Sequence, residues 1–341
     1  MTGKKRVLFF DTARVVSMIW IVCIWHLSAS MRSFPNLTNP ICSSITVAAL
    51  SVFTFISAFF VSGRVKTKSD IIPFYINRFS RFFFLYAISC ASMVTARYLS
   101  GSESMMTIQQ FVLSLLGLST LIGPSPITLW FFSMLILFYL ITPFIDLIQH
   151  IAWKIVSLVL IYCMITGFIL LFDGDLRVLV FYPSYCVGLL LSQDTKSSIS
   201  SGRIFENKRF PVYALIDVIV LVVSVALYAE NYDSVYWMLY RIPISLASIG
   251  FVIIIAKMIS FRCTQRVIML GSYISMCVYL FHSQFFWIAE LIFGKMTYAQ
   301  AYLIILPLLF VTCWMIQRLY DTFSRWLRLR RMRKDESSFS S

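Results

Sequence analysis

The sequence contains few charged residues for its length. Of its 341 residues, 13% are charged and 59% are hydrophobic, whereas soluble globular proteins carry about 25% charged residues. Between Val7 and Arg318 no soluble-looking block is longer than about twenty residues. This scarcity of charge excludes a water-soluble enzyme and predicts one all-α integral membrane unit.

Paired cysteines and internal repeats are also missing. The eight cysteines are spread singly, most of them inside apolar runs, without the spacing that a zinc site or a disulfide framework needs. We find no repeat of the kind that marks inverted-repeat transporters. We therefore expect no metal site, and we expect the cysteines to be small buried hydrophobic residues.

Basic residues are abundant, with a formal net charge of +14. They lie between apolar segments, where positive charge sets the orientation of a membrane protein, so we do not expect a nucleic-acid partner. The basic start at residues 4–6 and the apolar run after it are compatible with a signal peptide. Asp11 and Arg14 interrupt that run, which favours an uncleaved first span.

Ten segments are long and apolar enough, or nearly so, to cross a membrane as helices. They are roughly 7–29, 41–62, 79–98, 127–148, 153–172, 176–193, 211–229, 236–257, 267–289 and 297–319. An eleventh run, 108–122, is about fifteen residues long and ends at a Gly-Pro-Ser-Pro sequence. We expect a bundle of about ten transmembrane helices with 108–122 as a re-entrant or interfacial segment.

The distribution of basic residues orients these spans. With ten spans and a cytoplasmic N-terminus, 23 of the 29 Lys and Arg residues lie in inner segments and five lie in outer ones. This partition predicts two cytoplasmic termini. We divide the chain into a membrane domain at 1–320 and a basic, Ser-rich cytoplasmic tail at 321–341 that binds anionic membrane lipid.

Ionisable groups at membrane depth are functional candidates because burying them is costly. Asp11 and Arg14 are three residues apart in the first span, so they can pair. His26 lies about 30 Å beyond Arg6 at helical rise, towards the outer face, and His282 lies in an outer half as well. A lone histidine at that depth is more often a hydrogen-bonded packing residue, and the third, His150, falls at an inner loop.

Two arginines, Arg78 and Arg81, stand among aromatic residues at 72–81. We place them on one side of a helix start at the cytoplasmic face. Guanidinium groups bind phosphate through paired hydrogen bonds, so an anionic substrate arriving from the cytoplasm suits this position. The alternative is that the two arginines only set the orientation of the helix, by the positive-inside rule, and bind no substrate.

Five short motifs occur in an order that identifies a family. They are Asp11-Thr12-Ala13-Arg14 running to His26, Val61-Ser62-Gly63, Asn77 to Arg81, Leu129-Trp130-Phe131-Phe132 with Tyr139 and Pro143, and Gly271-Ser272-Tyr273 through Tyr279 to His282. Together they resemble the membrane acyltransferase-3 family, whose bacterial members O-acylate cell-envelope glycans. The likeness covers almost the whole chain.

The resemblance implies a ten-helix enzyme of the bacterial cytoplasmic (inner) membrane. It would take an acyl group, with acetyl expected, from cytoplasmic acetyl-CoA and pass it to a hydroxyl of a cell-surface or lipid-linked glycan. Acyl-CoA would be a substrate, and no bound cofactor is expected. The implied site residues are catalytic Arg14 and His26, donor-binding Arg78 and Arg81, and substrate-binding Asp11, Trp130, Tyr279 and His282. Acyl transfer needs a base near the hydroxyl, and His26 is the first-span candidate for it.

One spacing departs from the family pattern. The family usually has ten residues between the arginine and the histidine, and this sequence has eleven. At about 100° per residue, the extra residue moves the two side chains from about 20° to about 120° apart. We therefore predict a local helix bulge between Val15 and Trp25 that returns Arg14 and His26 to one face.

Two other function classes remain open at this point. A polysaccharide polymerase or lipid-linked-sugar glycosyltransferase is suggested only by Asp173-Gly174-Asp175, which falls on an outer loop. A transporter or flippase would have broken helices with paired charges at the midplane, where Asp217 is a lone candidate.

Overall fold

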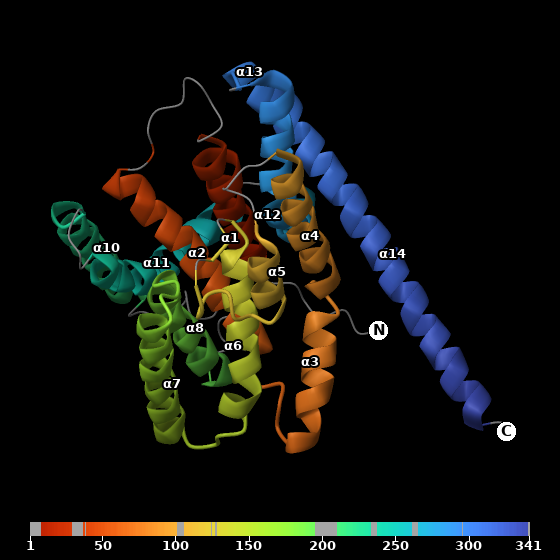
Figure 1. Ribbon diagram of the computed structural model, residues 1–341. Coiled ribbons are helices and arrows are strands. Elements are labelled where there is room, and N and C mark those ends of the chain that lie inside the picture. Colours follow the sequence, from red (N-terminus) through yellow and green to blue (C-terminus); the bar gives the residue numbers. More distant parts are fainter. Residues whose placement is uncertain are drawn as a thin grey trace.

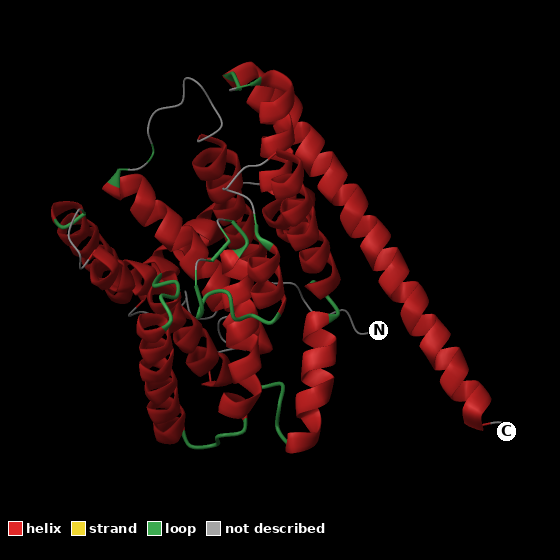
Figure 2. Ribbon diagram, viewed as in Figure 1, coloured by secondary structure: helices red, strands yellow, loops and turns green. Residues whose placement is uncertain are grey.

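The computed structural model describes residues 8–28, 37, 39–100, 106–123, 125–126, 128–194, 210–232, 237–260, 265–294 and 296–339. Within these ranges the chain forms helices and connecting turns, and no strand is present (Figures 1 and 2). The helical class predicted from hydropathy is therefore confirmed.

The described helices follow one another in this order. They are α1 (Leu8–Met18), η1 (Ile19–His26), α2 (Pro40–Val61), η2 (Lys68–Asp70), α3 (Ile71–Phe79), α4 (Phe83–Ser100), α5 (Ile108–Leu115), α6 (Trp130–Asp146), α7 (Ile151–Leu171), α8 (Arg177–Asp194), α10 (Phe210–Glu230), α11 (Trp237–Ser260), α12 (Gln265–Phe293), α13 (Tyr298–Gln300), η4 (Ala301–Ile305) and α14 (Leu306–Phe339). In Figure 1 the α2–α3 and α6–α7 connections lie at the lower end and α13 lies at the upper end.

Seven of the described helices are long and apolar enough to cross a membrane. The bent pair α3–α4, with an angle of 49°, would make an eighth, and α6 and α8 are shorter apolar helices. The structure therefore supports a multi-pass membrane protein, while the count of ten stays a prediction. α5 has eight residues, too few to span a bilayer, and its re-entrant placement also stays a prediction.

The first span changes its winding halfway. α1 is a regular helix, and η1 continues it as a π-helix of eight residues ending at His26. A π-helix bonds each residue to the fifth one along and so holds more residues per turn. The bulge predicted between Val15 and Trp25 is confirmed, in the form of a stretch longer than a single wide turn. That it returns Arg14 and His26 to one face stays a prediction.

A break separates α3 from α4 at residues 80–82. Arg78 lies in the last turn of α3, and Arg81 lies in the break itself. The prediction that both arginines share one side of a helix start is therefore wrong. The segment 79–98 carries no proline or glycine, so its hydropathy gave no signal of the bend.

The centre of the bundle is a close contact between α2 and α8. A Cβ atom at Gly188 of α8 would lie 2.6 Å from the carbonyl oxygen of Phe55 in α2, so only glycine fits at this approach. Such small residues let membrane helices pack closely. α6 lies almost wholly buried beside them, whereas α7 and α10 expose many large apolar side chains, as lipid-facing helices do.

One buried carboxylate closes the turn after α2. The oxygens of Asp146, at the end of α6, accept hydrogen bonds from Ser62 Oγ at 3.3 Å and from the backbone N–H groups of Gly63, Arg64 and Val65 at 3.0 to 3.4 Å. Gly63 has φ +72°, a conformation that favours glycine. The Val-Ser-Gly motif at 61–63 is thus a turn tied to α6.

The tail predicted at 321–341 is helical as far as Phe339, because α14 continues through it (Figure 1). Its basic residues from Arg328 onward lie outside the described side chains. The predicted lipid contact of the tail therefore stays a prediction.

Candidate functional site

A cavity of about 610 Å³ opens where the ends of several helices converge. Residues near the starts of α2, α6, α8 and α11 line it, together with the end of η1 and the second half of α12. Its lining residues are Ile21, Trp25, His26, Ser43, Thr46, Val47, Leu50, Thr128, Trp130, Arg177, Val180, Phe181, Arg241, Tyr279, His282, Ser283, Phe286, Trp287 and Glu290. We call it the histidine pocket.

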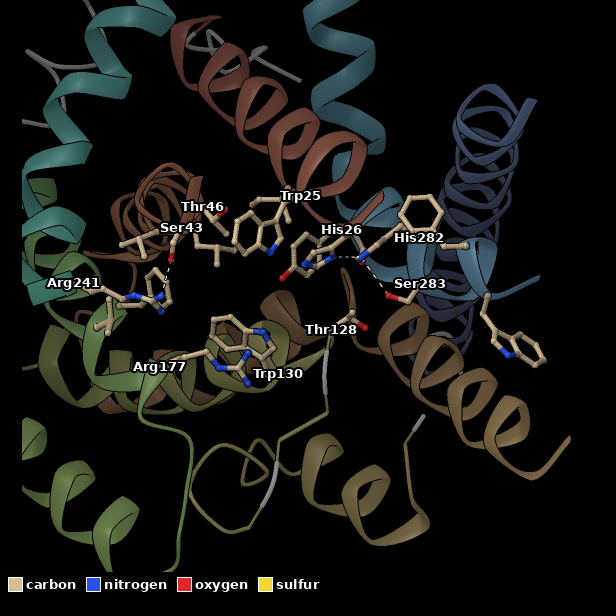
Figure 3. A pocket seen from close by; sticks show the side chains of 18 of the residues that line it. Trp25, His26, Ser43, Thr46, Thr128, Trp130, Arg177, Arg241, His282 and Ser283 are labelled. Carbon is tan, nitrogen blue, oxygen red and sulfur yellow. Dashed lines mark hydrogen bonds between the residues drawn. The ribbon is translucent and has the colours of Figure 1, made fainter. Parts of the chain in front are cut away.

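Two imidazole rings meet in this pocket (Figure 3). Nδ1 of His26 lies 2.5 Å from Nε2 of His282, and the rings stack with centroids 4.7 Å apart. His282 is fully buried, and its Nδ1 lies 2.7 Å from the carbonyl oxygen of Tyr279. The sequence placed both histidines at one depth, and the structure brings them into contact.

Arg177 lies between the histidines and the far end of the pocket (Figure 3). The guanidinium of Arg177 stacks on the ring of Trp130, 4.1 Å from its centroid. It also donates hydrogen bonds to both carboxylate oxygens of Asp175, at 2.6 to 3.0 Å. Asp175 is therefore engaged by an arginine, which weakens its interpretation as part of a metal-binding Asp-x-Asp motif.

Arg241 occupies the end of the pocket away from the histidine pair (Figure 3). It donates hydrogen bonds to the hydroxyl groups of Tyr228 and Ser43, and it stacks on Trp237 with 4.1 Å to the ring centroid. Within the described part of the chain no carboxylate pairs with it. The pocket thus presents ordered cationic and aromatic groups opposite two imidazoles.

The pair predicted in α1 forms, but away from the histidine pocket. Nη1 of Arg14 lies 3.5 Å from an oxygen of Asp11, which also accepts a hydrogen bond of 2.6 Å from Ser272 Oγ. The guanidinium lies over Phe60 of α2. Trp130, Tyr279, His282 and His26 therefore share one cavity, and Asp11 and Arg14 do not line it.

Arg78 and Arg81 lie in two different environments. Arg78 donates a hydrogen bond to the hydroxyl of Tyr139 in α6 and stacks on its ring at 4.1 Å. Arg81 instead lines a second cavity, of about 1000 Å³, between α3–α4 and α12–α14. On the α12–α14 side of this cavity, Asp321 accepts hydrogen bonds from Tyr273 and Gln317.

A series of tilted aromatic rings in mutual contact lies between Arg78 and the histidine pocket. The rings of Tyr139, Phe82, Phe132 and Tyr279 follow one another with centroids 6.1, 6.0 and 5.6 Å apart, and Tyr279 contacts His282 at 5.6 Å. The two cavities share no lining residue.

No cluster of three or more His, Cys, Asp or Glu residues suited to a metal ion occurs among the residues that the structure describes. Asp217, the mid-span candidate for a transporter, lies against Gly250 of α11 in a groove lined by α10 and α11. It has no place in the histidine pocket.

Sequence reasoning missed Arg177, Arg241, Ser43 and Tyr228 as site residues. A signal for the two arginines was present, because both belong to the five basic residues that the charge partition assigns to the outer side. Ser43 and Tyr228 carry no such signal, since a serine or tyrosine in an apolar helix is common and only its contacts distinguish it.

Comparison with known proteins gives one match. Residues 7–318 match the family model described as "Acyltransferase domain" of the acyltransferase-3 group. No curated protein and no solved structure matches the chain. Because the matched region is nearly the whole chain, this multi-pass helical protein belongs to the membrane acyltransferase-3 family.

Proposed function

We propose that the protein is an O-acyltransferase that moves an acyl group, acetyl in the simplest case, from cytoplasmic acyl-CoA to a glycan hydroxyl across the bacterial inner membrane. The observation that carries the proposal is the His26–His282 pair in the wall of a polar and aromatic pocket. Membership of an acyltransferase family supports the reaction class.

The histidine pocket supplies the acceptor side of the reaction. His26 takes the proton of the acceptor hydroxyl, a step in which a placed base contributes about 10²- to 10⁴-fold. Trp25 and Trp130 offer flat ring faces, and Arg177 and Arg241 offer hydrogen-bond donors. A glycan presents both C–H faces and hydroxyl groups, so a few placed polar groups among aromatic rings suit it.

The second cavity supplies the donor side. Arg81 lines it and would hold a phosphate of CoA through charge-assisted hydrogen bonds. Tyr273 in this cavity and His282 in the histidine pocket are nine residues apart on α12, or about 14 Å at helical rise. An extended pantetheine arm would carry the thioester along this length, past Arg78 and the series of aromatic rings.

Arg14 has a proposed role apart from His26. It lies before the π-helix, near the beginning of the first span, where it contacts Asp11 and Phe60. We assign it to the donor side of the path. Glycan, acyl-CoA and membrane lipid are the proposed partners, and acyl-CoA enters as a substrate.

The test is consumption of radiolabelled acetyl-CoA by the protein in lipid nanodiscs, with a mixture of envelope glycans as acceptors. His26→Ala is compared with His150→Ala, because His150 is an exposed histidine outside both cavities. We expect His26→Ala to lower transfer by about 100-fold or more and His150→Ala to leave it unchanged. Wild-type protein that moves a labelled sugar and no acetyl group would contradict the proposal in favour of a glycosyltransferase.

A further inference from the structure

The hydrogen-bond partners of the two histidines determine which nitrogen carries the proton in each ring. Nδ1 of His282 lies 2.7 Å from the carbonyl oxygen of Tyr279, and a carbonyl oxygen only accepts hydrogen bonds. Nδ1 of His282 therefore carries hydrogen. In a neutral imidazole the other nitrogen, Nε2, then holds a lone pair and accepts.

The protonation of His282 in turn determines which nitrogen of His26 carries hydrogen. Nε2 of His282 accepts, and it lies 2.5 Å from Nδ1 of His26, so Nδ1 of His26 donates and carries hydrogen. The lone pair of His26 is then on Nε2, the nitrogen outside the pair. We infer that His282 is a positioning residue that holds His26 in the Nδ1–H tautomer and leaves Nε2 of His26 as the basic atom.

His282 is well held for this task. Its side chain is 0% exposed, and its ring contacts those of Tyr279 and Phe286 with centroids 5.6 and 5.7 Å away. The neighbouring hydroxyl of Ser283 lies 3.3 Å from the same Nε2 and is a second donor to that lone pair. A ring fixed by packing and by a backbone carbonyl imposes its tautomer on the more accessible His26.

The tautomer matters for the transfer step, and here the inference rests on the proposed function. The acceptor O–H proton moves to Nε2 of His26, the acceptor oxygen bonds to the thioester carbonyl carbon, and the C–S bond breaks. The leaving thiolate then takes the proton from Nε2. While His26 is cationic, its Nδ1–H bond to His282 is charge-assisted and stronger. The opposite tautomer would present N–H to the hydroxyl and offer no base.

A spectroscopic experiment tests the tautomers without reference to activity. The chain has three histidines, so ¹⁵N-histidine labelling in lipid bilayers gives three ring-nitrogen pairs, and His150→Gln removes the third. At neutral pH we expect both remaining rings to carry hydrogen on Nδ1. A wild-type spectrum with His26 protonated on Nε2 alone would overturn the inference.

Two substitutions of His282 test the role in turnover. Gln places an acceptor oxygen near the position of Nε2, whereas Leu fills similar space with no acceptor. We expect His282→Leu to lower kcat about 100-fold or more, with the KM for acetyl-CoA within about twofold, since loss of tautomer control lowers kcat roughly 10⁴-fold in the Ser-His-Asp triad. We expect His282→Gln to keep at least about a tenth of wild-type kcat.

The possible negative results distinguish the positioning role of His282 from the proposed acyl-transfer function. A His282→Leu protein with wild-type kcat overturns the positioning role and leaves the acyl transfer intact. Wild-type protein that does not use acetyl-CoA overturns the proposed function, and the ¹⁵N spectrum still decides the tautomers. Should His282→Leu not fold, the spectrum of wild-type protein and the kcat of His282→Gln still decide the inference.

Discussion

Substitution of Asp146 tests how the turn after α2 is held against the end of α6. Its carboxylate accepts hydrogen bonds from Ser62 Oγ and from three consecutive backbone N–H groups, those of Gly63, Arg64 and Val65. The same hydroxyl of Ser62 reaches the carbonyl oxygen of Leu189 in α8 at 3.1 Å. One side chain of α6 thus fixes the end of α2, beside α8.

The expected effect of Asp146→Ala follows from the burial of each donor. Val65 is 1% exposed. Its backbone N–H loses its acceptor in the variant, and a buried N–H without a hydrogen bond costs about 1–3 kcal/mol. Gly63 and Arg64 are exposed, so water replaces the carboxylate there and each loss is about 0.5–1 kcal/mol. In the variant the hydroxyl of Ser62 still donates its hydrogen bond to the carbonyl oxygen of Leu189. We therefore expect a decrease of about 3 kcal/mol in the free energy of unfolding.

The assay is unfolding by SDS in mixed micelles, followed by tryptophan fluorescence. Asp146→Asn keeps the shape and one acceptor oxygen, so its decrease should be about half that of Asp146→Ala. Glu230→Ala, at an exposed end of α10, serves as a control and should stay within about 0.5 kcal/mol of wild type. An Asp146→Ala protein within about 1 kcal/mol of wild type would refute the assignment of this turn to Asp146.

Three further predictions address helix packing, donor binding and the π-helix. Gly188→Leu should lower the free energy of unfolding by about 1–3 kcal/mol through overpacking against α2, whereas Gly167→Leu, with open space around its Cβ position, should not. Arg81→Ala should weaken acetyl-CoA binding, measured by titration calorimetry, about tenfold or more, and unchanged binding would exclude Arg81 from the donor site. Deletion of Ile19 removes the extra residue of the π-helix, so the variant should regain α-helical winding and keep at least about a tenth of wild-type transfer; complete loss with intact folding would show that His26 needs the wider turns.

The sequence predicted the simple spans well. The apolar run at 41–62 corresponds to α2 (Pro40–Val61), and the run at 153–172 corresponds to α7 (Ile151–Leu171). Hydropathy succeeds there because membrane helices must be apolar for about 20 residues. The predicted span at 79–98 corresponds to α4 (Phe83–Ser100) but begins too early, before the bend at 80–82, because apolar content does not report the direction of a helix axis.

The sequence predicted several residues of the candidate site, but it did not predict which of them are in contact. His26, Trp130, Tyr279 and His282 share one pocket; a common depth predicts this for the two histidines, and the family resemblance implies Trp130 and Tyr279. The bond between His26 and His282 joins residues 256 positions apart, and no periodicity within one helix reaches that far. The resemblance implies a shared catalytic role for Arg14 and His26, yet Arg14 contacts Phe60 of α2 and does not line the histidine pocket.

Basic residues that depart from the positive-inside rule are informative about the site. The rule explains most basic residues by orientation alone, so the few that it assigns to the outer side need another explanation. Of the three such residues whose side chains are described, two line the histidine pocket, Arg177 and Arg241, and the third is Arg97. Each of the two stacks on a tryptophan and is held by oxygen acceptors. The contacts of these two arginines in the histidine pocket therefore explain their positions better than an orientation signal does.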